Sequence, residues 1–185
     1  SVRTELSSKP AKAAAGGLDL LNALLAAPPE RPVRHGKRIG WPWGTRGLLV
    51  HLGMSGKFVE QPAADDKPSF ARIGWFQGDR AVWFVDRRRF GCVVAVERDD
   101  LELGLAAGHG PDALDEAPDG PGLKAILTGR RAIKVALMDQ AKIAGVGNIQ
   151  AAEALFRAQL DPRLPCNKLS DAQWEKLAEV LPLQL

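Results

Sequence analysis

The segment His51-Leu-Gly-Met-Ser-Gly56 has the composition of a tight loop with an apolar tip. Its two glycines, three positions apart, permit a sharp backbone excursion that leaves Met54 at the tip. An apolar side chain on an exposed loop is unfavourable unless it inserts into something, and a DNA base step is one place that accepts it. The alternative is a methionine that folds back to fill a gap in the core. The residues alone leave both interpretations open.

A second candidate is the segment Asp86-Arg-Arg-Arg-Phe-Gly91, in which three consecutive arginines precede an aromatic residue and a glycine. A solvated basic turn explains such a segment. The combination of arginine with Phe90 also suits phosphate neutralisation together with stacking against an unpaired base. An anionic protein partner would be attracted by the same charge, so the residues indicate an anion-binding loop without identifying the anion.

The third candidate is the segment 138–149, which has the pattern helix, Gly-x-Gly-Asn turn, helix. The glycines permit a sharp reversal, and we expect Asn148 at the N-cap of the second helix. Backbone N–H groups and the helix dipole favour an anion there, and a DNA phosphate is the natural ligand. The alternative is a structural corner in which the asparagine only caps the helix.

Short apolar segments separated by turns surround the first two candidates and predict an antiparallel sandwich or barrel. The expected strands are Gly47–Leu52, Ala71–Phe76, Arg80–Val85 and Cys92–Val96, and Gln77-Gly78-Asp79 has the chemistry of a hairpin turn. The N-terminal part is rich in Ala and Leu, which predicts helical pieces at Arg3–Ser8 and Gly17–Ala27. Proline residues end this pattern near residue 30.

Residues 97–122 are acidic and rich in Pro and Gly, and a helical period follows them. The expected helices are Leu123–Leu127, Ala132–Lys142 and Ile149–Ala158, and a fourth begins at Ser170, which forms a capping-box pattern with Gln173. The predicted fold class is α+β. It comprises a β-sandwich domain over residues 1–100 that is incomplete, an acidic connector over 101–122, and a helical domain over 123–185 that is truncated.

The charge distribution suits a polyanion bound by two basic regions. Residues 30–90 carry 12 Lys and Arg against 6 Asp and Glu, residues 91–122 carry one Arg against 8 acids, and residues 123–168 carry 8 basic residues against 3 acids. Ordinary variation on a charged surface is the alternative. We found no apolar segment long enough to cross a membrane and no signal peptide, so we expect a cytoplasmic, nucleoid-associated monomer. The two cysteines are far apart and predict neither a disulfide framework nor a complete zinc site.

The three segments occur together in an order and at separations that resemble the formamidopyrimidine-DNA glycosylase and endonuclease VIII family. The resemblance includes Gly-Val-Gly-Asn-Ile followed by Glu153-Ala-Leu-Phe156, the basic Arg34-His-Gly-Lys37 element, and Asp161-Pro162. It covers roughly residues 34–165. It implies a β-sandwich domain beside a helical domain that carries a helix–two-turn–helix motif, with double-stranded DNA containing a damaged base or an abasic site as the partner.

The resemblance also implies roles for single residues. Met54, Arg88 and Phe90 would fill the gap left by an extruded nucleotide. Lys37 and Asn148 would hold phosphates beside the lesion, and His51 either supports the Met54 loop or has a buried structural role. The full set of residues expected to contact DNA is Lys37, His51, Met54, Arg88, Arg89, Phe90, Lys142 and Asn148.

The implied activity is that of a bifunctional DNA glycosylase and AP lyase in base-excision repair, acting on oxidised bases of the 8-oxoguanine and formamidopyrimidine type. The family's nucleophile is an N-terminal proline, whereas this chain begins Ser1-Val-Arg-Thr-Glu, so we expect none of its residues to be catalytic. We expect no metal or cofactor in this chain, and a zinc finger only if a C-terminal segment is missing from it. Either the sequence is partial, or the protein is an inactive homologue that binds damaged DNA without cleaving it.

Overall fold

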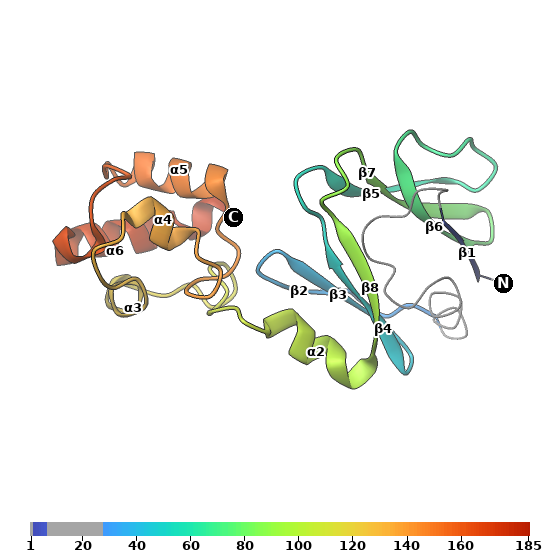
Figure 1. Ribbon diagram of the computed structural model, residues 1–185, viewed down its shortest axis with the longest axis horizontal. Coiled ribbons are helices and arrows are strands. Elements are labelled where there is room, and N and C mark those ends of the chain that lie inside the picture. Colours follow the sequence, from blue (N-terminus) through green and yellow to red (C-terminus); the bar gives the residue numbers. More distant parts are fainter. Residues whose placement is uncertain (1, 7–27) are drawn as a thin grey trace. The chain divides into compact units, whose positions relative to one another are not determined.

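The computed structural model describes the backbone of residues 2–6 and the whole of residues 28–185 (Figure 1). The chain divides into two compact units, Ser1–Leu105 and Ala106–Leu185. Within the described residues, the first contains the strands and helix α2, and the second contains the remaining helices, so the fold is α+β as predicted. None of the helices in these residues has the length and hydropathy needed to span a bilayer.

The β unit consists of two four-stranded antiparallel sheets. One has the order β1-β6-β7-β5, with bounds Val2–Leu6, Ala71–Gln77, Arg80–Asp86 and Gly56–Pro62. The other has the order β2-β3-β4-β8, with bounds Val33–His35, Arg38–Trp43, Arg46–His51 and Cys92–Glu97. Buried side chains of both sheets form one cluster, in which Trp43 and Leu48 of one sheet join Trp75 and Phe84 of the other. The predicted sandwich is therefore present.

The turns of these sheets follow the local sequence. Gly78, with φ of 60°, and Asp79 connect Gln77 to Arg80 in the β6–β7 hairpin, which confirms the predicted turn. The predicted helix at Arg3–Ser8 is wrong over the residues that the structure describes, because β1 there pairs antiparallel with β6. Pairing with a sheet edge overrides weak helix propensity. The predicted helix Gly17–Ala27 lies outside the described residues.

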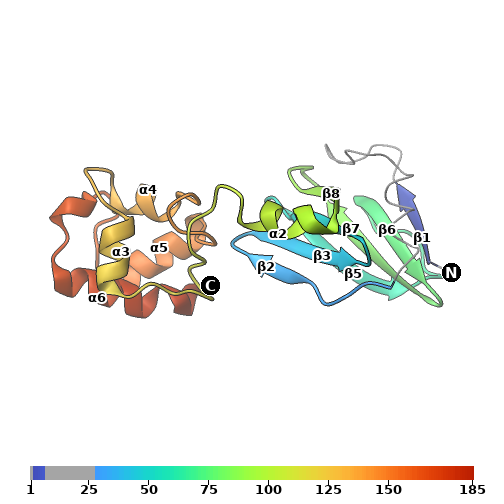
Figure 2. The same cartoon turned by 90° about the horizontal axis from the view of Figure 1, so that it is seen from below.

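Helix α2 (Arg98–Ala106) packs on the β2-β3-β4-β8 sheet (Figure 2). Its buried Leu101 and Leu105 lie against two glycines of that sheet. A Cβ on Gly40 would lie 2.7 Å from Leu105 Cδ1, and one on Gly47 would lie 2.7 Å from Leu101 Cδ2. The first residues of the expected connector 101–122 are thus part of the β unit. Further along this stretch, the Asp112 carboxylate is buried and accepts hydrogen bonds from the backbone N–H groups of Leu114 and Asp115.

The helical unit contains α3 (Gly120–Ile126), α4 (Ile133–Leu137), α5 (Asn148–Arg157) and α6 (Asp171–Val180), with short 3-10 turns at Cys166–Lys168 and Pro182–Gln184. A single core around Leu137, Leu155 and Trp174 joins them. The capping box of Ser170 and Gln173 is confirmed. The predicted helix Ala132–Lys142 is too long: α4 ends at Leu137, and a turn begins in which Asp139 O accepts from the backbone N–H groups of Lys142 and Ile143.

Candidate nucleic-acid interface

Two loops meet at one end of the β1-β6-β7-β5 sheet. The Met54 loop (residues 52–56) leads into β5, and the arginine loop (residues 86–91) follows β7, its neighbour, with Gly56 paired to Asp86. Gly53 has a φ of 64°, and a Cβ on it would lie 2.5 Å from the Phe90 carbonyl carbon. Only glycine permits this approach, because it tolerates the left-handed conformation and has no Cβ. The two sequence motifs therefore form one structure.

The buried carboxylate of Asp86 holds the two loops together. It accepts a hydrogen bond from Ser55 Oγ at 2.6 Å, which ties it to the Met54 loop. It also accepts from the backbone N–H groups of Arg88 at 3.2 Å and Gly91 at 2.8 Å, which shape the arginine loop. Ser55 Oγ in turn accepts from Arg88 N at 3.1 Å. A buried charge is stable only with such partners.

Opposing effects determine the pKa of Asp86. Desolvation by burial is the largest single effect and raises it. The hydrogen bonds from Ser55 and from the backbone of Gly91, Arg88 and Arg89 together outweigh desolvation, so the pKa of Asp86 lies below its usual value. The carboxylate is therefore ionised at neutral pH, and its charge stabilises the loop from inside.

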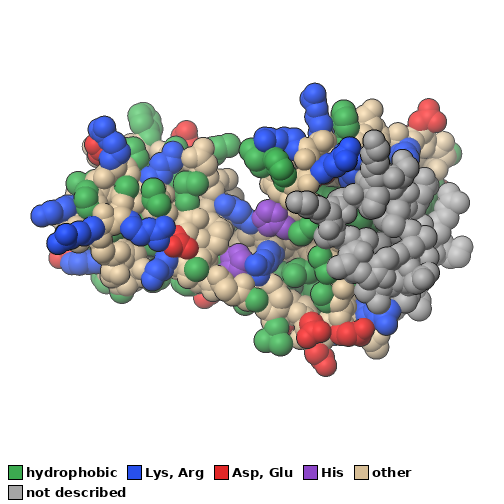
Figure 3. Space-filling view, viewed as in Figure 1, with side chains coloured by type: hydrophobic (Ala, Val, Ile, Leu, Met, Phe, Trp, Pro, Cys, Tyr) green, Lys and Arg blue, Asp and Glu red, His purple; other side chains and the backbone are tan. Residues whose placement is uncertain are grey.

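The tips of both loops point into solvent. Met54 is 71% exposed and Phe90 is 57% exposed, so neither side chain fills the core. The Arg88 guanidinium lies over the Phe90 ring at 4.9 Å from its centroid, a cation–π arrangement that orients both groups. Arg89 is exposed and adopts a left-handed φ of 59°. In Figure 3 basic and hydrophobic side chains gather at the end of the β unit where these loops lie in Figure 1.

His51 stands at the base of the Met54 loop, at the end of β4. Its Nδ1 accepts a hydrogen bond from the backbone N–H of Gly53 at 3.1 Å. Nδ1 therefore carries no proton in this arrangement. The side chain is half-buried, and of the two predicted roles for His51 this contact fits support of the loop.

Lys37 lies at the tip of the β2–β3 hairpin, in a two-residue turn with Gly36, whose φ is 58°. The Lys37 side chain is exposed, and partial desolvation lowers the pKa of its ammonium group. Arg38, the next residue, donates from Nη1 to the carbonyl oxygens of Gly104 at 2.8 Å and Leu105 at 3.3 Å. The hairpin is thereby joined to the last turn of α2, which fixes the base of the turn that carries Lys37.

In the helical unit the turn between α4 and α5 is held by Gln140. Its Nε2 donates to the carbonyl oxygens of Met138 at 3.0 Å and Val146 at 2.8 Å, and its Oε1 accepts from Gly145 N at 3.1 Å. Gly145 has a φ of 101°, which favours glycine. One side-chain amide thus closes the reversal that the glycines permit.

Asn148 is the first residue of α5 rather than its N-cap, which corrects the prediction. The N-cap is Gly147, in an extended conformation with φ −106° and ψ −177°. The Asn148 side chain is exposed at the start of a ten-residue helix, where the first N–H groups lack intrahelical acceptors. Lys142 is exposed in the preceding turn, and its backbone N–H donates to Asp139 O at 2.8 Å.

The structure thus brings Met54, Arg88, Arg89, Phe90 and His51 together in the β unit. It places Lys37 on a separate hairpin of that unit, and Lys142 and Asn148 around one turn of the helical unit. Sequence reasoning missed three polar side chains that organise these loops: Ser55, Asp86 and Gln140. All three lay within the motifs, but no local pattern distinguishes a loop residue that turns inward from one that faces solvent.

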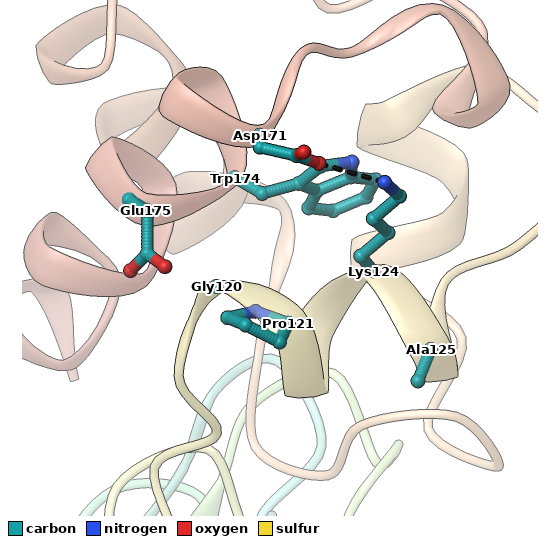
Figure 4. A pocket seen from close by; sticks show the side chains of 7 residues that line it. All are labelled: Gly120, Pro121, Lys124, Ala125, Asp171, Trp174 and Glu175. Carbon is teal, nitrogen blue, oxygen red and sulfur yellow. Dashed lines mark hydrogen bonds and ion pairs between the residues drawn. The ribbon is translucent and has the colours of Figure 1, made fainter.

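A hollow of about 520 Å³ lies between α3 and α6 (Figure 4), and none of the residues expected to contact DNA lines it. Trp174 and Pro121 line it, and Lys124 Nζ forms an ion pair of 2.6 Å with Asp171 across one side. Within residues 28–185 there is no group of three or more His, Cys, Asp or Glu side chains arranged to hold a metal ion. The zinc finger, expected only if a C-terminal segment is missing from this chain, stays a prediction.

Comparison with known proteins identifies both units. Residues 5–93 match the formamidopyrimidine-DNA glycosylase N-terminal domain, and residues 109–182 match the formamidopyrimidine-DNA glycosylase H2TH domain. The formamidopyrimidine-DNA glycosylase of Methylococcus capsulatus is 38% identical over 148 residues, which are 79% of this chain and 55% of that protein. That of Bdellovibrio bacteriovorus is 42% identical over 130 residues, 69% and 48% of the two chains. The chain spans about half the length of the curated relatives it matches.

Solved structures show the same fold. The Lactococcus lactis Fpg in complex with DNA containing an abasic site has a TM-score of 0.87 at 23% identity, covering 98% of this chain and 68% of that chain. The complex of the Lactococcus lactis protein with DNA containing FAPY-dG gives a TM-score of 0.87, also at 23% identity, with 98% and 69% covered. Because models of one family match both units, and relatives of 38% and 42% identity cover more than two thirds of it, the chain belongs to the formamidopyrimidine-DNA glycosylase family.

Proposed function

We propose that this chain belongs to a base-excision repair glycosylase and AP lyase that binds DNA and removes oxidised bases of the 8-oxoguanine and formamidopyrimidine type. Its partner is double-stranded DNA with a damaged base or an abasic site, bound by a monomer in the cytoplasm beside the nucleoid. The names of the matched relatives and the bound DNA in related structures support this assignment.

One observation carries the proposal: a single buried carboxylate, Asp86, joins two loops whose tips are an exposed methionine and a stacked Arg–Phe pair. An exposed apolar side chain beside a cation suits insertion into a base stack while the guanidinium meets a phosphate or an unpaired base. Extruding a nucleotide costs a few kcal/mol, and inserted side chains offset part of that cost. Met54, Arg88 and Phe90 would fill the space, with His51 supporting the Met54 loop.

The remaining predicted contacts are with phosphates. Lys37 at its hairpin tip, Arg89 in the arginine loop and Lys142 in the turn before α5 supply positive charge. Asn148 supplies a side-chain amide at the start of α5. Such contacts position the duplex without reading its sequence. We therefore expect Lys37→Ala and Asn148→Ala to weaken binding to all DNA sequences alike.

The proposed insertion of Met54, Arg88 and Phe90 into the base stack, called the wedge below, is tested on the full-length protein by comparing two substrates. Met54→Ala and Phe90→Ala should slow release of a paired 8-oxoguanine by at least tenfold, while affinity for a duplex with a tetrahydrofuran abasic analogue falls much less, because that nucleotide needs less unstacking. The conservative Met54→Leu variant should retain most of the rate. Unchanged excision by Met54→Ala would contradict the wedge assignment.

The chemistry is tested separately by borohydride trapping on the full-length protein. A covalent adduct with abasic DNA is expected if a nucleophilic amine forms a Schiff base with the sugar. Tight binding of the abasic duplex with no trapped adduct and no nicking would instead identify a homologue that binds damaged DNA without cleaving it.

A further inference from the structure

A second aromatic–arginine pair lies beside the arginine loop. The Arg87 guanidinium carbon lies over the Phe70 ring at 5.6 Å from its centroid, and Phe70 is 51% exposed. Arg87 and Arg88, consecutive in the chain, therefore stack on different rings, Phe70 and Phe90. None of the three sequence motifs includes Phe70.

The backbone that presents this pair is strained and firmly held. Phe70 has a φ of 64°, which is rare for a bulky residue without a special reason. Its carbonyl oxygen accepts from Asp86 N at 3.1 Å, and the Asp86 carbonyl oxygen accepts from Nε of the buried Arg72 at 2.9 Å. Phe70 and Arg72 are thus both hydrogen-bonded to the backbone of Asp86, the residue whose carboxylate joins the Met54 loop to the arginine loop. Strain that the surroundings maintain is concentrated at functional positions in proteins.

The sheet order places the pair in line with the proposed wedge. Strands β5, β7 and β6 are consecutive neighbours, and at the same end of the sheet they carry the Met54 loop, the arginine loop and Phe70. Neighbouring strands are about 4.8 Å apart, so Phe70 lies about 10 Å from the Met54 position along this edge. That distance corresponds to about three nucleotide steps of about 3.4 Å each.

The charge at this edge suits a polyanion. Arg87, Arg88 and Arg89 are exposed there, and the only carboxylate of their loop, Asp86, is turned inward. The loop that precedes Phe70 contains Asp65 and Asp66, but Gln61 Nε2 donates to the Asp66 carbonyl oxygen at 2.9 Å. Gln61 pairs with Ala81, near the opposite end of β5 and β7, so these two acids lie away from the arginines.

We propose that Arg87 and Phe70 form a further DNA contact in which Arg87 neutralises a phosphate about three nucleotides from the wedge and Phe70 packs against the adjoining sugar. The inference rests on the proposed function, since it requires duplex DNA on this edge. The ring holds the guanidinium over its face and so limits the conformational freedom that Arg87 would otherwise lose on binding. The pair extends the grip along the duplex without contributing to base extrusion.

The test measures the salt dependence of affinity for a 25-nucleotide duplex with a central tetrahydrofuran abasic analogue. Arg87→Gln should lower the slope of log K against log salt by about 0.9, the value for one phosphate, which corresponds to about eightfold weaker binding at 0.1 M salt. Arg87→Lys should keep the slope. The matched control is Arg80→Gln, which removes the same charge from the opposite end of β7 and should leave the slope unchanged.

Phe70→Gly separates binding from folding. Glycine relieves the left-handed strain, so the denaturant midpoint should stay or rise while the affinity falls severalfold. The Arg87→Gln/Phe70→Gly double variant should bind no more weakly than about the Arg87→Gln variant, because the two groups act as a unit. A wild-type slope for Arg87→Gln together with wild-type affinity for Phe70→Gly, with a steep wild-type salt dependence, would overturn this inference alone. A salt-insensitive wild-type affinity would overturn the proposed function as well.

Discussion

Replacing Asp86 by asparagine tests whether one buried charge holds the Met54 loop and the arginine loop in place. Asparagine keeps the shape of the side chain but removes the charge and exchanges one acceptor oxygen for an NH₂ donor. If the remaining oxygen keeps Ser55 and Arg88 as donors, the Gly91 N–H, which donates at 2.8 Å in the wild type, faces another donor. A buried donor without an acceptor costs about 1–3 kcal/mol, and the surviving hydrogen bonds lose their charge assistance.

Relief of the desolvation penalty for the charge offsets part of this loss, so we expect Asp86→Asn to lower the free energy of unfolding of the β unit by about 2–4 kcal/mol. Urea unfolding followed by tryptophan fluorescence measures it, because four of the five tryptophans, Trp41, Trp43, Trp75 and Trp83, lie in this unit. The matched control is Asp79→Asn in the exposed β6–β7 turn, which should change stability by less than about 0.5 kcal/mol.

The difference in unfolding free energy between the wild type and Asp86→Asn should depend on pH in a definite direction. The folded-state pKa of Asp86 lies below its usual value, so its ionisation contributes stability above the unfolded-state pKa, about 3.9. That contribution is lost as the pH falls through the folded-state value. The difference between the wild type and Asp86→Asn should therefore be constant from about pH 5 to 8 and shrink below about pH 4. A difference that is absent at pH 7, or that does not shrink in acid, would refute the assigned role of the carboxylate.

Three further perturbations test other parts of the structure. Gly53→Ala should destabilise the β unit by more than about 2 kcal/mol in urea unfolding, because the new Cβ would lie 2.5 Å from the Phe90 backbone at a φ of 64°. The control Gly78→Ala has a similarly strained φ but open space around the new Cβ, so it should cost less. Ser170→Ala should cost about 1 kcal/mol in the helical unit, since it removes the N-cap acceptor of α6, and Ser170→Asp should recover most of it; equal stability of all three would contradict the capping role. Burial raises the pKa of the Cys166 thiol, so iodoacetamide at pH 8 should label the half-buried Cys92 well before Cys166, as peptide mass spectrometry would show; faster labelling of Cys166 would be inconsistent with its burial.

Much of the fold could be predicted from the sequence because its signals are local. Alternating apolar segments and the Gln77-Gly78-Asp79 turn predicted the sandwich strands, and the Ser170–Gln173 pattern predicted the start of α6. Sequence patterns failed in two places, one decided by a distant strand and the other by hydrogen bonds within a turn. The N-terminal strand exists because β6 offers an edge to pair with, and α4 stops at Leu137 because the turn that follows satisfies its own backbone.

The same distinction applies to the candidate site. The exposed tips, Met54, Arg88 and Phe90, could be identified because an apolar or aromatic side chain beside glycine and arginine is unusual in a loop. The side chains that fix the loops could not, since Ser55 and Asp86 are 31 residues apart and their hydrogen bond is a product of the β5–β7 pairing. Phe70 escaped notice for the same reason: only the fold brings it to Arg87.

At this end of the sheet the inward-facing side chains fix the backbone, so the outward-facing side chains can be changed independently of it. Ser55, Asp86, Gly53 and Gly91 determine the backbone path, whereas the side chains of Met54, Phe90 and Arg87 are exposed. A combinatorial library that varies Met54, Phe90 and Arg87 while those four positions are kept should therefore yield mostly folded members. Selection on such a library for the proposed DNA binding would then change the contact surface without changing the fold that supports it.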